Sequence, residues 1–266
     1  MDQPQTLDRI RAVVVFLTCL FMIGSNVVNG TKVSEVAESP TSGVIDPATW
    51  AFGIWGLIFL LALIHAGYQL LPRNLVRPVF RATGWPLATT FLLTGLWPIA
   101  VVAGQLNVAQ LLLAAMWALL ALVFLRVARV GDLASRDRWL VALPVAPFFG
   151  WLTAANPVSV FSRLTDTGIV TPHGAGNLVG VGLLLITGCI AAWFVREGQR
   201  GPAQLWGAYA LTIGWAIVGI VANQPGLTSL GAVGSLVAAI PVVVASWVGV
   251  SQPGGPSRPV VGSTLA

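Results

Sequence analysis

The side chains that stand out for binding chemistry in this sequence are aromatic rings near residue 50. Trp50, Phe52, Trp55 and Phe59 follow one another within a long apolar run, and the last three have the i, i+3, i+7 spacing that places them on one helix face. Contact with lipid needs nothing more specific than leucine. Bulky rings at this spacing therefore indicate either a packed helix interface or a pocket for a flat apolar ligand, and the sequence leaves both open.

Catalytic and metal-binding patterns are absent from the sequence. It contains no evident nucleophile–base pair, paired carboxylates, HExxH motif or phosphate-binding loop, so no catalytic residue and no metal site are predicted. His65 is the only histidine within an expected membrane span and could relay a proton or bind a metal. Because no span holds an acidic partner for it, we favour a packing role.

The elements that must position these rings are membrane helices. The chain has 56% hydrophobic and 9% charged residues and a mean hydropathy of +0.84, whereas soluble domains carry about 25% charged residues. The composition predicts an all-α fold, a polytopic transmembrane helical bundle in contact with membrane lipids. An excess of 14 basic over 9 acidic residues then serves to orient the helices, and no nucleic-acid partner is expected.

Apolar runs bounded by charged residues, glycine or proline predict about eight spans. They lie near residues 11–29, 48–71, 85–104, 108–128, 139–160, 175–195, 204–223 and 227–250. If the N-terminus is cytoplasmic, Lys32 and Arg163 are outside and the other twelve of the 14 basic residues are inside. This split predicts an integral protein of a bacterial cytoplasmic membrane with both termini cytoplasmic. The longest outer loop, 30–47, is either a lid or a solvated connector.

Three tryptophans from different spans are expected at a similar depth. At about 1.5 Å per residue, Trp55, Trp97 and Trp151 all reach the outer half of the bilayer, where the three indoles can meet. Helical spacing also places an aromatic-to-small face on the fifth span, formed by Phe148, Trp151, Ala155 and Ser159.

Prolines within these spans predict local disturbance of the helices. Pro98 follows Trp97, and Pro144, Pro147 and Pro157 are expected to interrupt the fifth span. Because proline lacks an N–H group, such helices can bend and release a carbonyl toward a cavity. Simple tolerance of proline by membrane helices is the alternative.

Three short motifs resemble the TspO/MBR family, that is, the tryptophan-rich sensory protein/translocator protein or peripheral benzodiazepine receptor family. Residues 50–59, WAFGIWGLIF, are similar to its W-x-F-G-P-x-W-x-x-L-Y stretch with one deletion and with Phe59 in place of the tyrosine. Trp97-Pro98 keeps the end of its N-W-x-W-P motif. Residues 147–159 follow its P-Y-x-x-W-x-x-x-A-T-x-x-N spacing, with Phe, Asn and Ser as substitutions.

The resemblance implies a longer branch of that family. Residues 1–165 would form the five-helix membrane core, 166–250 three additional transmembrane helices, and 251–266 a disordered tail. The family binds tetrapyrroles and sterol-like lipophiles in a pocket of the core. The implied ligand-binding residues are Trp50, Phe52, Trp55, Phe59, Trp97, Pro98, Phe148, Trp151, Ala155 and Ser159.

These observations give a leading functional hypothesis and two alternatives. The leading one is a non-enzymatic sensor, receptor or carrier that binds a small lipophilic ligand, such as a porphyrin or haem-like molecule, with no resident cofactor. The second is a facilitator of a small neutral solute, with a path between the core and the last three spans. The third, which rests on the family's handling of porphyrins, is a membrane enzyme acting on tetrapyrroles or isoprenoids. A homodimer is left open, because Gly176 and Gly180 suit close helix contact within or between protomers.

Overall fold

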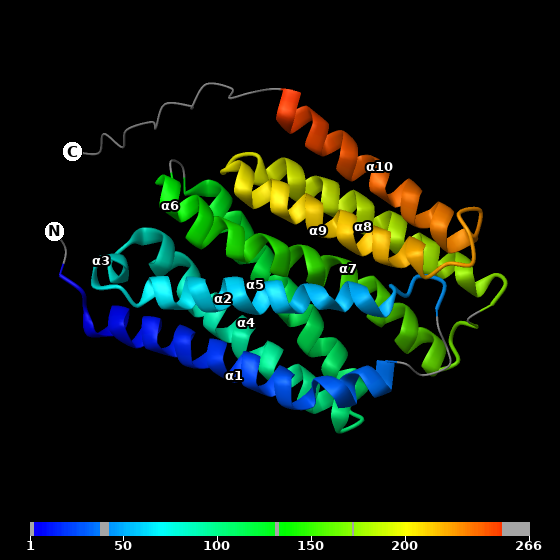
Figure 1. Cartoon of the computed structure of the whole chain (residues 1–266), viewed down its shortest axis with the longest axis horizontal. Coiled ribbons are helices and arrows are strands. Elements are labelled where there is room, and N and C mark those ends of the chain that lie inside the picture. Colours follow the sequence, from blue (N-terminus) through cyan, green and yellow to red (C-terminus); the bar gives the residue numbers. More distant parts are fainter. Residues whose placement is uncertain (1–2, 38–42, 131–132, 172, 252–266) are drawn as a thin grey trace, which may run out of the picture.

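The computed structural model describes residues 3–37, 43–130, 133–171 and 173–251, and these residues form helices joined by short connections (Figure 1). The elements are α1 (Thr6–Ala37), the 3-10 helix η1 (Thr49–Gly53), α2 (Ile54–Gln69), α3 (Pro72–Leu75), α4 (Pro78–Val102), α5 (Leu106–Arg129), α6 (Ser135–Asp137), the π-helix η2 (Arg138–Ala142), α7 (Leu143–Asp166), α8 (Gly176–Gly198), α9 (Ala203–Ala222) and α10 (Leu230–Ser251). Among these described residues, eight stretches are long and apolar enough to cross a membrane, which confirms the predicted helical membrane bundle.

The predicted spans match these helices, with differences at their ends. α1 continues to Ala37, so the first part of the loop expected at 30–47 is helical. α4 begins at Pro78, seven residues before the expected start, because Pro at the first helical position suits a helix N-terminus. Residues 38–42 lie outside the described residues, as does the expected disordered tail apart from Ser251, which ends α10.

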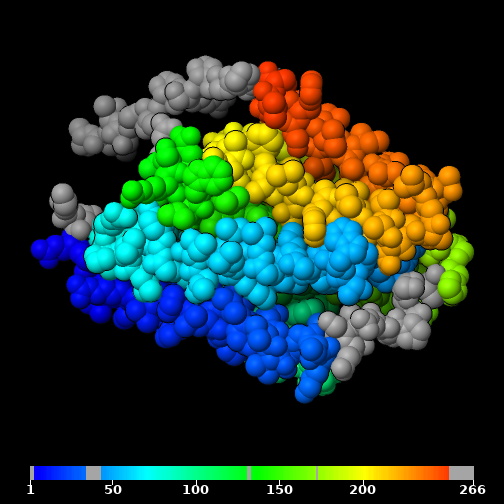
Figure 2. Space-filling model, viewed as in Figure 1, coloured from blue at the N-terminus to red at the C-terminus, as the bar shows by residue number. Residues whose placement is uncertain are grey.

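Five helices close a ring. α1 packs on α2 and α4, α5 packs on α4 and α7, and α2 packs on α7. These helices contain the motifs used to infer a five-helix core. In Figure 1 the other three long helices, α8, α9 and α10, cover the α7 side of this ring, and α10 is the outermost. Figure 2 shows α2 lying along the visible face between blue α1 and the yellow and orange C-terminal helices.

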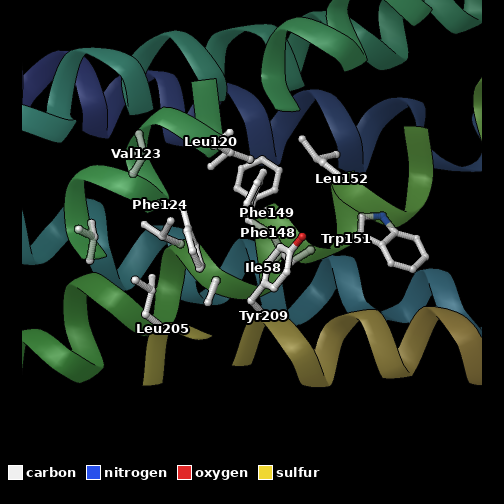
Figure 3. Packing of buried hydrophobic residues seen from close by; sticks show 14 of the residues in the cluster. Ile58, Leu120, Val123, Phe124, Phe148, Phe149, Trp151, Leu152, Leu205 and Tyr209 are labelled. Carbon is white, nitrogen blue, oxygen red and sulfur yellow. The ribbon is translucent and has the colours of Figure 1, made fainter. Parts of the chain in front are cut away.

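Buried aromatic side chains of α5, α7, α8 and α9 pack together where the five-helix ring meets the C-terminal helices. Phe149 of α7 contacts Phe124, Phe194 and Tyr209 at centroid separations of 5.3, 4.7 and 5.0 Å, and Figure 3 shows the labelled members packed together. The Thr153 hydroxyl lies beside these aromatic side chains and accepts hydrogen bonds from Trp117 Nε1 and the Tyr209 hydroxyl at 3.0 and 3.2 Å. The ring and the C-terminal helices therefore share one continuous hydrophobic core.

The prolines in α4 free backbone carbonyls that neighbouring helices then use. Pro98 cannot donate to the carbonyl of Thr94, four residues earlier, and Asn26 Nδ2 of α1 donates to that oxygen at 3.1 Å. In the same way, Pro86 leaves the carbonyl of Ala82 to Arg126 of α5. The released carbonyls thus form links between helices.

The prediction that prolines interrupt the fifth span is wrong for Pro147 and Pro157, whereas an irregular segment does lie next to Pro144. α7 runs unbroken from Leu143 to Asp166 through Pro147 and Pro157. The irregular segment is η2, which comes immediately before it. The chain is widened by this π-turn directly before Pro144, and the helix that follows stays regular.

Candidate ligand site inside the five-helix ring

One face of α2 points into the five-helix ring and is buried. Ile58, Ala62, His65 and Gln69 recur at helical spacing and are all nearly inaccessible to solvent. The first two are apolar, whereas His65 and Gln69 place polar groups in the interior one turn apart. Gln69 Nε2 and Oε1 both lack a hydrogen-bond partner within the described part of the chain.

A small cavity lies where α2, α4 and α7 meet. Its volume is about 10 Å³, and its lining is Ala62, His65, Leu87, Phe91, Pro144, Val145 and Phe148. This space is close to the minimum for one water molecule. A flat organic ligand therefore fits only if the surrounding side chains move apart.

Aromatic rings continue from this cavity toward the α2 N-terminus. Phe148 and Phe91 are nearly parallel, with an interplanar angle of 6° and centroids 6.4 Å apart. Phe148 also meets Trp55 edge to face at 5.9 Å, and Trp55 lies 5.4 Å from Phe59. We call Trp55, Phe59, Phe91 and Phe148 the aromatic column. Three of its four members are among the residues predicted for the site.

His65 is fixed by the disturbance at the start of α7. Pro144 cannot donate to the Leu140 carbonyl, and His65 Nδ1 lies 2.9 Å from that oxygen. Because a carbonyl only accepts, Nδ1 carries the hydrogen of this bond. In the neutral ring Nε2 is then an acceptor, and it is buried without a partner among the described residues. Within the cavity lining, His65 is the one residue with a polar side chain.

The other predicted residues near the start of α2 lie elsewhere. Trp50 packs edge to face on Trp215 of α9 at 4.9 Å, and Trp215 Nε1 donates to the Ala51 carbonyl at 2.9 Å. Phe52 meets Trp151 at 5.4 Å. Trp151 is buried, and Figure 3 shows its indole pointing away from Phe149 and Tyr209. The aromatic residues at the start of this span therefore pack against two different helices, Trp50 on α9 and Phe52 on α7.

The remaining predicted residues do not join the aromatic column. Trp97 packs with Ala100, Val101 and Ala109 in a cluster between α4 and α5, and no ring pair connects it to Trp55 or Trp151 among the described residues. Pro98 is buried in α4. Ala155 is half-buried, and the Ser159 hydroxyl lies 2.5 Å from Gln110 Oε1 on α5. Trp55, Trp97 and Trp151 therefore do not meet, and each packs against different neighbours.

The described part of the connection between α1 and α2 is held by the C-terminal helices. The Ala48 N–H donates to the Gly219 carbonyl at 2.9 Å, and Asn223 and Gln224 donate to the carbonyls of Asp46 and Val44 at 3.1 Å each. Ile45 is fully buried against α7, α8, α9 and α10. Burial raises the pKa of the Asp46 carboxyl to about 6.

Comparison with known proteins decides the family. A family model described as TSPO-like protein matches residues 8–248, a range that includes parts of all eight long helices. The chain belongs to the TSPO-like protein family. This finding confirms the resemblance read from the three motifs, and together with the eight apolar helices it establishes an integral membrane protein. No curated protein and no solved structure gives a significant match.

The TSPO-like ring contains site residues that sequence reasoning missed. Leu87, Phe91 and Val145 line the cavity but belong to none of the three motifs. His65 was assigned to packing, and only one of its two ring nitrogens has a partner. Two signals in the sequence were available: His65 lies about three helical turns after Ile54 on the inward face, and Pro144 follows Leu140 by four residues.

Proposed function

We propose that this TSPO-like protein binds a flat lipophilic molecule, such as a tetrapyrrole, inside the five-helix ring. It would act as a sensor, receptor or carrier and carry out no chemical reaction on the ligand. The observation that supports this most is the aromatic column, which leads to His65 Nε2, an unpaired acceptor in the cavity lining. The range matched by the TSPO-like family, residues 8–248, includes residues from all five helices of this ring.

The chemistry of the ring interior suits such a ligand. Aromatic faces and apolar side chains favour a flat conjugated molecule through area burial and ring stacking. A free-base tetrapyrrole also carries N–H donors, and His65 Nε2 can accept one of them. Because the resting cavity is small, binding requires Phe91, Phe148 and their neighbours to separate.

The facilitator hypothesis has no comparable support. Its path would run between the ring and the last three long helices, where Phe124, Phe149 and Tyr209 are fully buried against one another. Solute passage there would require α7 and α9 to separate along a well-packed contact. We therefore place the ligand within the ring.

The test is a titration of the purified full-length protein with protoporphyrin IX, followed by the absorbance of the porphyrin itself. The decisive variant is Trp55→Leu, which shortens the aromatic column. Trp50→Leu is the matched control, because this indole lies five residues earlier and packs on α9. Absorbance of the ligand is unaffected by the loss of one tryptophan from the protein.

We expect saturable binding that weakens about tenfold in Trp55→Leu, in line with about 1.5 kcal/mol for the lost aromatic contact. Trp50→Leu should bind as the unmodified protein does. Equal affinity in all three proteins, or equal weakening in both variants, would contradict binding of the ligand at the aromatic column.

A further inference from the structure

A second, polar pocket lies at the opposite end of α2 from Trp50. It has a volume of about 410 Å³ and is formed by the end of α2, by α3, by the residue before α4, and by α6. Its chemistry-bearing residues are Tyr68, Arg73, Asn74, Arg77, Ser135 and Asp137, and Arg136 adds a third guanidinium. None of these residues belongs to the aromatic column.

At the floor of this pocket, the charges of Arg77 and Asp137 neutralise each other. Asp137 is fully buried and pairs through both oxygens with the two terminal nitrogens of Arg77, one of these bonds being 2.7 Å long. The Tyr68 hydroxyl donates to the same carboxylate at 3.1 Å, and Asn74 Nδ2 donates to the Tyr68 carbonyl at 2.6 Å. The single acidic group of the pocket is thus occupied by Arg77.

The walls carry positive charge that nothing in the described part of the chain neutralises. Arg73 and Arg136 are exposed, and their guanidinium groups make no ion pair or hydrogen bond with other described residues. Three arginines against one aspartate leave two positive charges around the cavity. A guanidinium presents a planar fork of donors that matches phosphate oxygens, and the Ser135 hydroxyl can add another donor.

The pocket lies where two apolar spans end, at the level where we expect the lipid headgroups. α2 leaves the apolar span at Gln69 and α4 enters the next at Pro78, so the pocket occupies the boundary between the two. Trp139, three residues after Arg136, is exposed, as an amphipathic ring at a membrane surface would be. Leu60, Ile64 and Leu71 expose an apolar strip along and just beyond α2 that leads to the pocket.

We propose that Arg73 and Arg136 form a binding site for a phosphate group, and that its occupant is the headgroup of an anionic phospholipid. The phosphate lies between the two guanidinium groups over the Arg77–Asp137 pair. The acyl chains lie along the exposed apolar strip of α2. This site is independent of the proposed ligand in the ring.

The test measures lipid binding to the detergent-purified full chain by native mass spectrometry, with phosphatidylglycerol as the probe and phosphatidylcholine as the zwitterionic reference. We expect Arg73→Gln/Arg136→Gln to weaken phosphatidylglycerol binding at least about tenfold, because both guanidinium groups lose their charge-assisted hydrogen bonds to the phosphate. Both side chains are exposed, so folding should be unaffected. Arg73→Lys/Arg136→Lys, which keeps the charge but loses the fork, should retain part of the affinity.

The matched control is Arg129→Gln/Arg196→Gln, which removes the same charge from exposed helix-end positions. It should change phosphatidylglycerol binding by less than twofold. Equal weakening in the two double glutamine variants, or no preference over phosphatidylcholine, would overturn the site. If inorganic phosphate alone binds saturably and Arg73→Gln/Arg136→Gln abolishes this, the phosphate site stands and its occupant is a soluble phosphate compound.

Discussion

The hydrogen bond from Asn26 to the Thr94 carbonyl should stabilise the fold because Pro98 leaves that carbonyl free, and this dependence can be measured. Asn26→Ala leaves the Thr94 carbonyl without its donor from α1, in a position that is nearly inaccessible to solvent. Hydrogen bonds between membrane helices are worth about 0.6 kcal/mol on average and up to about 1.7 kcal/mol. Because Thr94 is buried and the remaining acceptor is a backbone group, we expect a loss of about 1 kcal/mol of unfolding free energy.

The same change should cost much less in a Pro98→Ala background. Alanine at position 98 supplies the N–H that an α-helix directs to the Thr94 carbonyl, so the donor from Asn26 is no longer needed. A double-mutant cycle by denaturant titration in mixed micelles measures this coupling, which we expect to be about 1 kcal/mol. An Asn26→Ala cost that is identical in both backgrounds would refute the account of Pro98 as the source of the free carbonyl.

Two further predictions concern packing and pH. Gly150→Val should lower the unfolding free energy by about 1–3 kcal/mol, because an added Cβ would lie 2.9 Å from Thr212 Cβ and 3.0 Å from the Tyr209 carbonyl oxygen. The added Cβ of Gly182→Ala would meet no atom within 4 Å, so this change should not lower stability when both variants are compared by thermal melts. The folded state holds the Asp46 proton up to a pKa of about 6 against an ordinary 3.8, so stability should fall as pH rises from 4 to 6. Asp46→Asn should remove this slope in melts at pH 4.5 and 7.5; a slope that persists, or that Asp166→Asn removes instead, would contradict the assignment.

The eight spans could be predicted because each is a local apolar run interrupted by turn or charged residues. The proline effects were also local, since the carbonyl released by Pro98 or Pro144 lies four residues earlier in the sequence. What the sequence did not provide was the donor that takes each carbonyl. Asn26 and His65 are each more than 60 residues from their acceptors, and only helix packing brings them together.

The candidate site was only partly predictable for the same reason. Helical spacing grouped Trp55 and Phe59 on one face of α2, and the structure places Phe148, which was also predicted, beside them. The residue that the structure adds is Phe91. Depth along a helix, however, does not fix the direction in which a side chain points. Trp50 therefore meets Trp215 on α9, a contact between residues 165 positions apart in the chain.

The most direct test of a ligand inside the ring uses two neighbouring residues of α7. Phe148 lines the ring cavity, whereas Phe149 packs with Phe124 and Tyr209 at the interface with α9. Protoporphyrin IX affinity should fall about tenfold in Phe148→Leu, in line with one lost aromatic contact, and stay unchanged in the folded fraction of Phe149→Leu. Loss of affinity in Phe149→Leu with none in Phe148→Leu would place the ligand outside the ring and contradict the account.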